Sequence, residues 1–296
     1  MNPHPPKFHV AQLLAAILLA AFVQSASAQV TFLQDSFATF NTNTWTRANT
    51  GSATNGVSGG FLQMNAVLLS SDQRAVVIST ATNLNPFVTQ DFTMTFSNLT
   101  IGGTPTVGTS NNNGAANLFY ALLGNANNSG NTAPANGTGN TYNPGNSATL
   151  AGYLSVSIAQ RVDLLNAPFT QILIDDKGAS NAAINFVLSG TPTSFTWAIN
   201  GTNKTHTLSL IGATFTNTGL STLTSSFSNF SSAGLSSGSY LAMGAMNRFG
   251  TVTTATTVSL DEVLVTAIPE PSTLALLTIA GVTGLVMLNR RRRGLK

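Results

Sequence analysis

The stretch SFTWAINGTNKTHTLSLI, residues 194–211, decides the fold class. Large apolar side chains alternate with small or polar ones in both of its halves, Ser194–Ile199 and Thr205–Ile211. Successive side chains of a β-strand point to opposite faces, so each half predicts a strand with one buried side. Trp197 falls on the apolar side of the first strand and His206 on that of the second. Both residues are therefore expected in a core rather than in a site.

Similar short runs continue in both directions, separated by Gly, Asn, Ser and Thr, and no amphipathic helix is predicted between residues 30 and 266. Asp176-Lys177-Gly178 is a turn signal, which predicts a hairpin of Gln171–Ile174 with Ala183–Leu188. About eleven short strands predict an all-β sandwich or barrel over residues 29–267. The other expected strands are Phe61–Met64, Ala75–Ser79, Phe92–Leu99, Leu118–Leu123, Tyr153–Ile158, Ser239–Met246 and Val258–Val265.

The composition excludes several classes of function. Charged residues make up 7% of the 296 residues, against about 25% in ordinary soluble domains. The net charge of +3 comes from the two ends, because residues 29–267 hold six basic and eight acidic side chains, scattered along the chain. We therefore expect no nucleic-acid binding, which needs a clustered basic face. The absence of cysteine excludes disulfides and thiolate chemistry.

The first 28 residues predict a secretory signal peptide. A weakly basic start containing Lys7 precedes an apolar run from Val10 to Val23, followed by small residues. Ala26 and Ala28 form an A-x-A cleavage site, so the mature chain is expected to begin at Gln29. The protein is thus expected to be exported.

The last residues, 268–296, predict a short membrane anchor. A transmembrane helix is expected over residues 272–289, and its apolar run Leu274–Leu288 would span about 22 Å as a helix. The hydrocarbon core of a bilayer is about 30 Å thick, so the anchor is marginal and suits a temporary attachment. The cluster Arg290, Arg291, Arg292 and Arg293 is expected to stay on the cytoplasmic side.

Pro269, Glu270 and Pro271 come directly before that helix. The order of Pro-Glu-Pro, apolar helix, Arg cluster and chain end resembles the PEP-CTERM sorting signal of Gram-negative bacteria that make exopolysaccharide. The resemblance implies that an exosortase, a membrane-embedded processing enzyme, acts on the tail. The precursor would then be held transiently in the inner membrane before the protein reaches the cell surface or the extracellular space.

Residues 102–148 are dominated by Asn, Gly, Thr and Ser, apart from a predicted strand over Asn117–Leu123. We expect two long polar loops that flank this strand, and long loops are either functional or mobile. Tyr142 lies in the second loop and is a candidate for stacking against a sugar ring.

The edges of the domain carry a second resemblance. Asp35-Ser36-Phe37 with Trp45 and Gly60-Phe61-Leu62, and the closing Ser259–Val263, are similar to the first and last strands of concanavalin-like (laminin-G-like) jelly rolls. The resemblance implies a two-sheet jelly-roll sandwich in which the first and last strands pair. It also implies that Asp35 and Asp261 could share a structural calcium ion, the one cofactor expected.

The titratable residues argue against an enzyme. His206 is the single histidine of the mature domain, and Glu262 is its single glutamate. Glycoside hydrolysis needs two carboxyl groups that flank the bond, and adjacent acids such as Asp261 and Glu262 point to opposite faces of a strand. No phosphate-binding glycine loop is present either.

The sequence supports three hypotheses about the function. The first is a non-enzymatic structural protein of the cell surface or extracellular matrix, which the low charge favours. The alternative is a carbohydrate-binding module for exopolysaccharide, with Tyr142 and Trp45 as candidate aromatic platforms. Tyr142 lies in a loop, whereas Trp45 is equally expected as a core residue. A polysaccharide hydrolase is a distant third.

Overall fold

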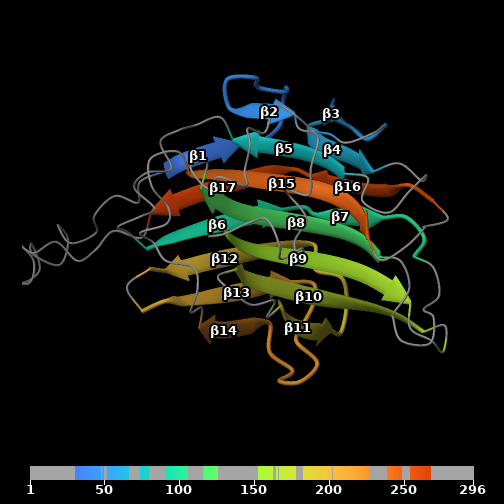
Figure 1. The fold of residues 1–296 in the computed structure, drawn as a ribbon, viewed down its shortest axis with the longest axis vertical. Helices are drawn as coiled ribbons and strands as arrows, with labels where there is room; N and C mark the ends of the chain where they lie inside the picture. The colour runs from blue at the N-terminus through green and yellow to red at the C-terminus, as the bar shows by residue number, and fades with distance from the viewer. Residues whose placement is uncertain are drawn as a thin grey trace, which may run out of the picture. The chain divides into compact units, whose positions relative to one another are not determined.

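Strands joined by turns account for the described residues, which contain no helix (Figure 1). The computed structural model describes residues 31–47, 49, 52–66, 74–79, 91–105, 116–125, 153–162, 165, 167–177, 183–201, 203–226, 239–248 and 254–267. Residues 31–267 form one compact unit. All the strand pairings between described residues are antiparallel.

Six strands form the first sheet, in the order β1-β17-β6-β12-β13-β14. Their bounds are β1 Thr31–Asp35, β17 Glu262–Ala267, β6 Phe92–Ser97, β12 Ser194–Asn200, β13 Thr205–Ile211 and β14 Thr222–Ser226. The pairing of β1 with β17 joins the first described strand to the last. This pairing is the one that the jelly-roll resemblance implies.

Seven strands form the second sheet, in the order β11-β10-β9-β8-β15-β5-β2. Their bounds are β11 Ala183–Leu188, β10 Pro168–Lys177, β9 Tyr153–Val162, β8 Ala116–Asn125, β15 Ser239–Arg248, β5 Arg74–Ser79 and β2 Trp45–Arg47. The predicted hairpin is confirmed as the pairing of β10 with β11. Asp176 and Lys177, which were expected in its turn, are instead the last two residues of β10.

The structure also has a third, smaller sheet with the strand order β3-β4-β16-β7. The prediction of two sheets did not include it. Its strands are β3 Thr54–Ser58, β4 Phe61–Ala66, β16 Thr256–Leu260 and β7 Thr100–Gly102. The predicted strand Val258–Val265 is in fact two strands that belong to different sheets. The chain leaves the small sheet after Leu260 and enters the six-stranded sheet at Glu262.

One hydrophobic core joins all three sheets, which confirms the all-β sandwich. Phe96 and Phe195 of the six-stranded sheet stack with ring centroids 4.6 Å apart, and Phe119 of β8 meets both rings edge-on. Trp197 and His206 are buried in the same sheet, as their alternation predicts. The Trp197 Nε1–H group donates to His206 Nδ1 at 3.4 Å.

The opposite face of the seven-stranded sheet carries a second buried apolar cluster, whose described members all belong to that sheet. Tyr120 of β8 lies across Gly244 of β15, its direct partner in the ladder. A Cβ on Gly244 would come within 2.5 Å of the Tyr120 ring, so this position needs glycine because of close approach. The seven-stranded sheet is therefore apolar on both faces.

Candidate functional site

The β9–β10 hairpin reaches further than the strands on either side of it. β8 pairs with β9 only as far as Gln160, and β11 pairs with β10 only as far as Thr170. Among the described residues the ladder beyond these positions joins β9 to β10 alone, with Arg161 opposite Phe169. Leu165, between the two strands, is 87% exposed. The end of the hairpin is thus a two-stranded ribbon, which twists more strongly than a wide sheet.

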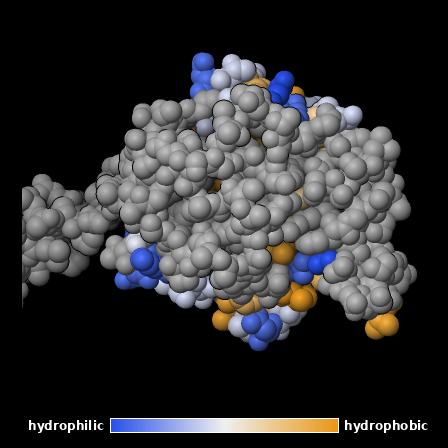
Figure 2. Space-filling view, viewed as in Figure 1, coloured by the Kyte–Doolittle hydropathy of each residue, from blue (hydrophilic) through white to orange (hydrophobic). Residues whose placement is uncertain are grey.

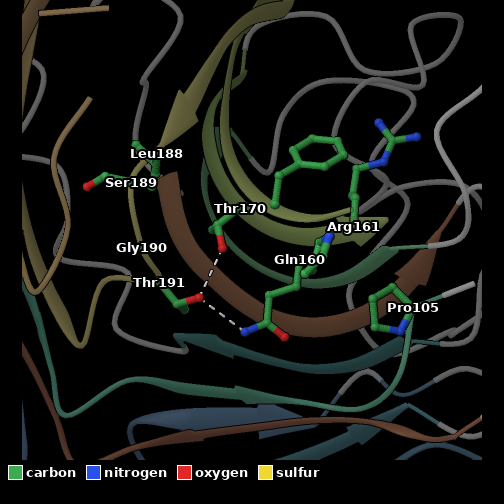
Figure 3. A pocket seen from close by; sticks show the side chains of 10 residues that line it. Pro105, Gln160, Arg161, Thr170, Leu188, Ser189, Gly190 and Thr191 are labelled. Carbon is green, nitrogen blue, oxygen red and sulfur yellow. Dashed lines mark hydrogen bonds between the residues drawn. The ribbon is translucent and has the colours of Figure 1, made fainter. Parts of the chain in front are cut away.

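A pocket of about 380 Å³ lies beside this ribbon. Its volume falls within the range of small-molecule sites, about 300–1,000 Å³. The hairpin supplies one side, and the loop that follows β11 supplies another (Figure 3). The residues that line it are Pro105, Gln160, Arg161, Pro168, Phe169, Thr170, Leu188, Ser189, Gly190 and Thr191.

Three neutral polar side chains meet in the pocket. Gln160 and Thr170 are opposite each other in the ladder, so their side chains share a face. Gln160 Nε2 donates to Thr191 Oγ1 at 3.3 Å, and the hydroxyls of Thr170 and Thr191 lie 3.0 Å apart (Figure 3). Amide and hydroxyl groups both donate and accept hydrogen bonds. This group can therefore exchange hydrogen bonds with a neutral, polar ligand.

The loop that carries Thr191 is fixed by the connection between β13 and β14. Ser189 N donates to Thr214 O at 2.9 Å, and Thr214 N donates to Ser189 Oγ at 3.1 Å. Gly190 lets the loop after β11 approach the loop after β13 closely, because a Cβ at Gly190 would lie 3.1 Å from the carbonyl oxygen of Gly212. Gly212 has a φ of +86°, a left-handed conformation that glycine adopts at little cost. The wall of the pocket is thus made of two interlocked loops.

Charge is confined to one residue of the lining. Among the described residues that line the pocket, Arg161 is the one charged side chain, and it is 8% exposed. Figure 3 shows its guanidinium pointing away from Gln160 and Thr191, as the alternation of side chains along β9 requires. No Asp, Glu or His is part of this described lining, so it lacks the groups that general acid–base catalysis uses.

The surface near the pocket mixes apolar and polar residues. Among the described residues, the exposed large apolar side chains are Leu165, Val187, Ile211 and Leu220. Figure 2 shows hydrophobic and hydrophilic residues side by side along the lower edge, where Figure 1 places β11 and β14. Val187 directly precedes Leu188 of the pocket lining, so part of this amphipathic edge adjoins the site.

Trp45 is a core residue, and the prediction that its ring stacks on a sugar is wrong. Its side chain is 1% exposed and packs on Phe37, with 6.1 Å between the ring centroids. Its Nε1–H group donates to Asp35 Oδ2 at 2.8 Å. A stacking platform must present a ring face to the ligand, which a buried indole does not do.

Asp35 and Asp261 do not fit a calcium site. Asp35 Oδ1 accepts from Phe37 N at 2.7 Å, and its other oxygen accepts from the Trp45 indole. Asp261 Oδ2 accepts from Asn98 Nδ2 at 2.8 Å. Within the described ranges, no group of three or more His, Cys, Asp or Glu side chains could hold a metal ion. Calcium takes six to eight oxygen ligands, so these carboxylates act instead as hydrogen-bond acceptors for the chain itself.

Other predicted features lie outside the described residues. These are the signal peptide with Ala26, Ala28 and Gln29, the sorting motif Pro269–Pro271, the helix 272–289, the cluster Arg290–Arg293, and Tyr142. In the part of the chain that the structure does describe, no helix qualifies as a membrane span. Of the polar segment 102–148, only residues 102–105 and β8 are described, and β8 contains the predicted strand.

Sequence reasoning missed Gln160, Thr170 and Thr191. Each lies just outside a predicted strand, since the expected strands ended at Ile158 or began at Gln171 and Ser194. Polar side chains at the ends of apolar runs were the one available signal. Only the register of the hairpin shows that two of them are opposite each other.

No protein-family model and no curated protein matches the chain. Solved structures do resemble it. Lectin II from Ulex europaeus is 12% identical with a TM-score of 0.46, over 81% of this chain and 100% of the lectin. Peanut lectin is 13% identical with a TM-score of 0.48, over 82% and 98%. A β-glucanase from Bacillus licheniformis is 11% identical with a TM-score of 0.43, over 82% and 100%. At these identities and TM-scores the similarity identifies neither a ligand nor an activity for this chain.

Proposed function

We propose that the domain is a non-enzymatic carbohydrate-binding module whose ligand occupies the pocket beside the β9–β10 hairpin. The observation that carries this proposal is the group of Gln160, Thr170 and Thr191, which offers amide and hydroxyl hydrogen bonds in a pocket of about 380 Å³. Phe169 also belongs to the lining, but it is opposite Arg161 in the ladder and so lies on the other face of the ribbon from Gln160 and Thr170. Neutral amide and hydroxyl groups suit a polyhydroxylated ligand, which both donates and accepts hydrogen bonds. The pocket thus favours the carbohydrate-binding alternative over the purely structural reading.

The fold assigned in this proposal is a concanavalin-like jelly roll. The pairing of β1 with β17 and the packing of a six-stranded sheet on a seven-stranded one support it.

Binding without hydrolysis is also part of the proposal. Hydrolysis of a glycosidic bond needs two carboxyl groups about 5–10 Å apart on either side of that bond. The described lining of the pocket holds no carboxylate. Glu262 lies in β17 of the six-stranded sheet, where its Oε1 accepts from Gln34 Nε2 at 2.8 Å.

A structural role in the extracellular matrix is the second candidate, and the outer face of the six-stranded sheet favours it. Pairs of threonine hydroxyls lie across neighbouring strands, 2.8 Å apart at Thr93 and Thr266 and 2.9 Å apart at Thr207 and Thr224. These pairs are uncharged, and Thr207 and Thr224 are partly or fully exposed whereas Thr266 is buried. The part of the face around Thr207 and Thr224 can therefore pack against another neutral surface without desolvating an ion.

Replacing Thr191 with valine is expected to weaken glycan binding about three- to tenfold. The change keeps the shape but removes the hydroxyl that joins Gln160 to Thr170, and one neutral hydrogen bond contributes about 0.5–1.5 kcal/mol. Glycan-array screening of the purified protein identifies the ligand, and titration calorimetry gives the affinities. Thr207→Val, on the outer face of the other sheet, is the matched control and should bind as the wild type does. No binding to any glycan would contradict the proposal and leave the structural role.

Export and release at the cell surface complete the proposal, and the order of signal peptide, Pro-Glu-Pro, apolar helix and Arg cluster supports them. In a host that contains an exosortase, Glu270→Ala is expected to leave a full-length precursor in the membrane fraction, because the processing motif is lost. Immunoblots of membrane and secreted fractions measure this. Glu262→Ala is the control, as it removes a glutamate outside the motif. Unchanged processing of Glu270→Ala would refute the motif.

A further inference from the structure

β12 ends at Asn200, which is followed by Gly201, and this Asn-Gly sequence is chemically reactive. The backbone nitrogen of Gly201 can attack Cγ, the side-chain carbonyl carbon of Asn200. A bond then forms between these two atoms, the nitrogen loses its proton, and Nδ2 leaves as ammonia. Water opens the resulting succinimide ring and leaves aspartate or isoaspartate. Glycine in the second position favours the reaction, since it carries no side chain and adopts many backbone conformations.

In the folded chain, one carboxylate binds both nitrogen atoms that take part in this reaction. Asn200 Nδ2, the leaving group, donates to Asp91 Oδ2 at 2.6 Å, and Gly201 N, the attacking group, donates to Asp91 Oδ1 at 3.1 Å. The amide oxygen is held as well, because Asn203 N donates to Asn200 Oδ1 at 2.6 Å. Hydrogen bonds to a charged group are about twice as strong as neutral ones. Ring closure requires the amide to turn toward Gly201 N, which breaks these bonds.

The register of the six-stranded sheet brings Asp91 to this sequence. Phe92, the first residue of β6, pairs with Ile199 of β12. Because the two strands are antiparallel, Asp91 and Asn200 follow this pair at the same end of the sheet. Asp91, Asn200 and Gly201 are each partly buried, so water competes less for the N–H groups that the carboxylate binds.

We propose that Asn200–Gly201 is a deamidation site and that Asp91 is a positioning residue, which keeps this site unreactive in the folded protein. The inference is independent of carbohydrate binding. Deamidation puts a carboxylate at position 200, where the amide of Asn200 now donates to Asp91. Two carboxylates at this distance repel each other, so the modified chain loses the contact between the ends of β6 and β12.

The test measures how fast individual Asn-Gly sequences deamidate. The purified protein is incubated in mildly alkaline buffer and digested, and mass spectrometry of the peptides gives the modified fraction at each time. Asp91→Ala is expected to raise the rate at Asn200 about ten- to a hundredfold, the range expected when one hydrogen bond to a charged group no longer has to break before ring closure. Asp91→Asn keeps one side-chain oxygen as an acceptor and should give a smaller increase. If Asp91→Ala fails to fold, as judged by circular dichroism, Asp91→Asn serves as the test.

Asn55–Gly56 in the same protein is the control for a general loss of structure. This second Asn-Gly sequence lies in β3, where Asn55 Nδ2 donates to Asn49 Oδ1 at 2.6 Å and to Val76 O at 2.7 Å, both neutral acceptors. Its rate should be the same in the wild type and in Asp91→Ala, because Asp91 forms none of these bonds. A variant that unfolds would instead react faster at both sequences.

Asp261→Ala is the matched control variant. Asp261 also binds a side-chain amide, that of Asn98, which follows the other end of β6, so its removal should leave the rate at Asn200 unchanged. Equal rates at Asn200 in the wild type and in Asp91→Ala would overturn the inference. A slower rate in Asp91→Ala would overturn it too, since Asp91 would then act as the base that takes the proton from Gly201 N. A parallel rise at Asn55 would show that Asp91 only stabilises the fold, and so would also contradict the proposal.

Discussion

Replacing Phe119 with alanine is expected to lower the free energy of unfolding by about 3–5 kcal/mol. Phe119 is fully buried, and its ring centroid lies 5.8 Å from that of Phe96 and 6.0 Å from that of Phe195. The two partners belong to the six-stranded sheet, whereas Phe119 belongs to the seven-stranded one. The truncation thus opens a cavity between two hydrogen-bonded sheets, which cannot collapse freely to fill it.

Urea unfolding followed by fluorescence measures this loss. Phe119→Leu keeps most of the volume and should cost about 1–2 kcal/mol. Leu220→Ala removes an apolar side chain that is 60% exposed and should stay within about 0.5 kcal/mol of the wild type. Equal losses for Phe119→Ala and Leu220→Ala would show that the aromatic contact between the sheets does not hold the sandwich together.

Asp35→Ala is expected to lower the free energy of unfolding by about 2–4 kcal/mol, because one carboxylate accepts two separate hydrogen bonds. One bond comes from the indole of the buried Trp45, which would lose its acceptor. The other comes from the backbone of Phe37, whose φ of +49° is unusual for a residue other than glycine. Asp35→Asn keeps one side-chain oxygen as an acceptor and should cost less.

The same change separates this role from calcium binding. A loss of about 2–4 kcal/mol corresponds to a melting temperature roughly 4–16 °C lower in a domain of this size. Since the carboxylate bonds to the chain, a chelator should leave the melting temperature of the wild type unchanged. A drop with chelator equal to that of Asp35→Ala would mean that a bound cation, rather than the two N–H groups, engages Asp35.

Alternation was a good guide wherever a strand has one buried face. The bounds of β11 and β13 agree with the prediction to the residue, and Trp197 and His206 are buried as expected. The missed strands give no such signal. β14 (TLTSS) lies at a sheet edge with one partly buried leucine, β2 and β7 are three residues long, and β3 contains a glycine. The sequence does not predict that the expected strand Val258–Val265 divides at Asp261 into β16 and β17. An apolar pattern does not show which sheet a strand joins.

The site was harder to predict than the fold. Trp45 is expected as an aromatic platform and Asp35, from the jelly-roll resemblance, as a calcium ligand. In the structure the indole of the buried Trp45 donates a hydrogen bond to the half-buried Asp35. The pocket is formed instead by neutral residues of ordinary type, brought together by the register of β9 with β10 and by the loop after β11. A threonine such as Thr191 becomes distinctive only when the fold places Gln160 and Thr170 against it.

The position of β16 and β17 constrains how the chain reaches its native state. β17 lies between β1 and β6, and β16 lies between β4 and β7, so two sheets have their last-made strands in their interior. Gln34 and Glu262, which share a hydrogen bond, are 228 positions apart. In a chain synthesised from its N-terminus, β1 and the β3–β4 hairpin must wait for nearly the whole domain before their partners exist. Such long-range pairing folds slowly and leaves strand edges open to association with other chains. Production of this protein therefore depends on keeping unfinished chains apart until residue 267 has been made.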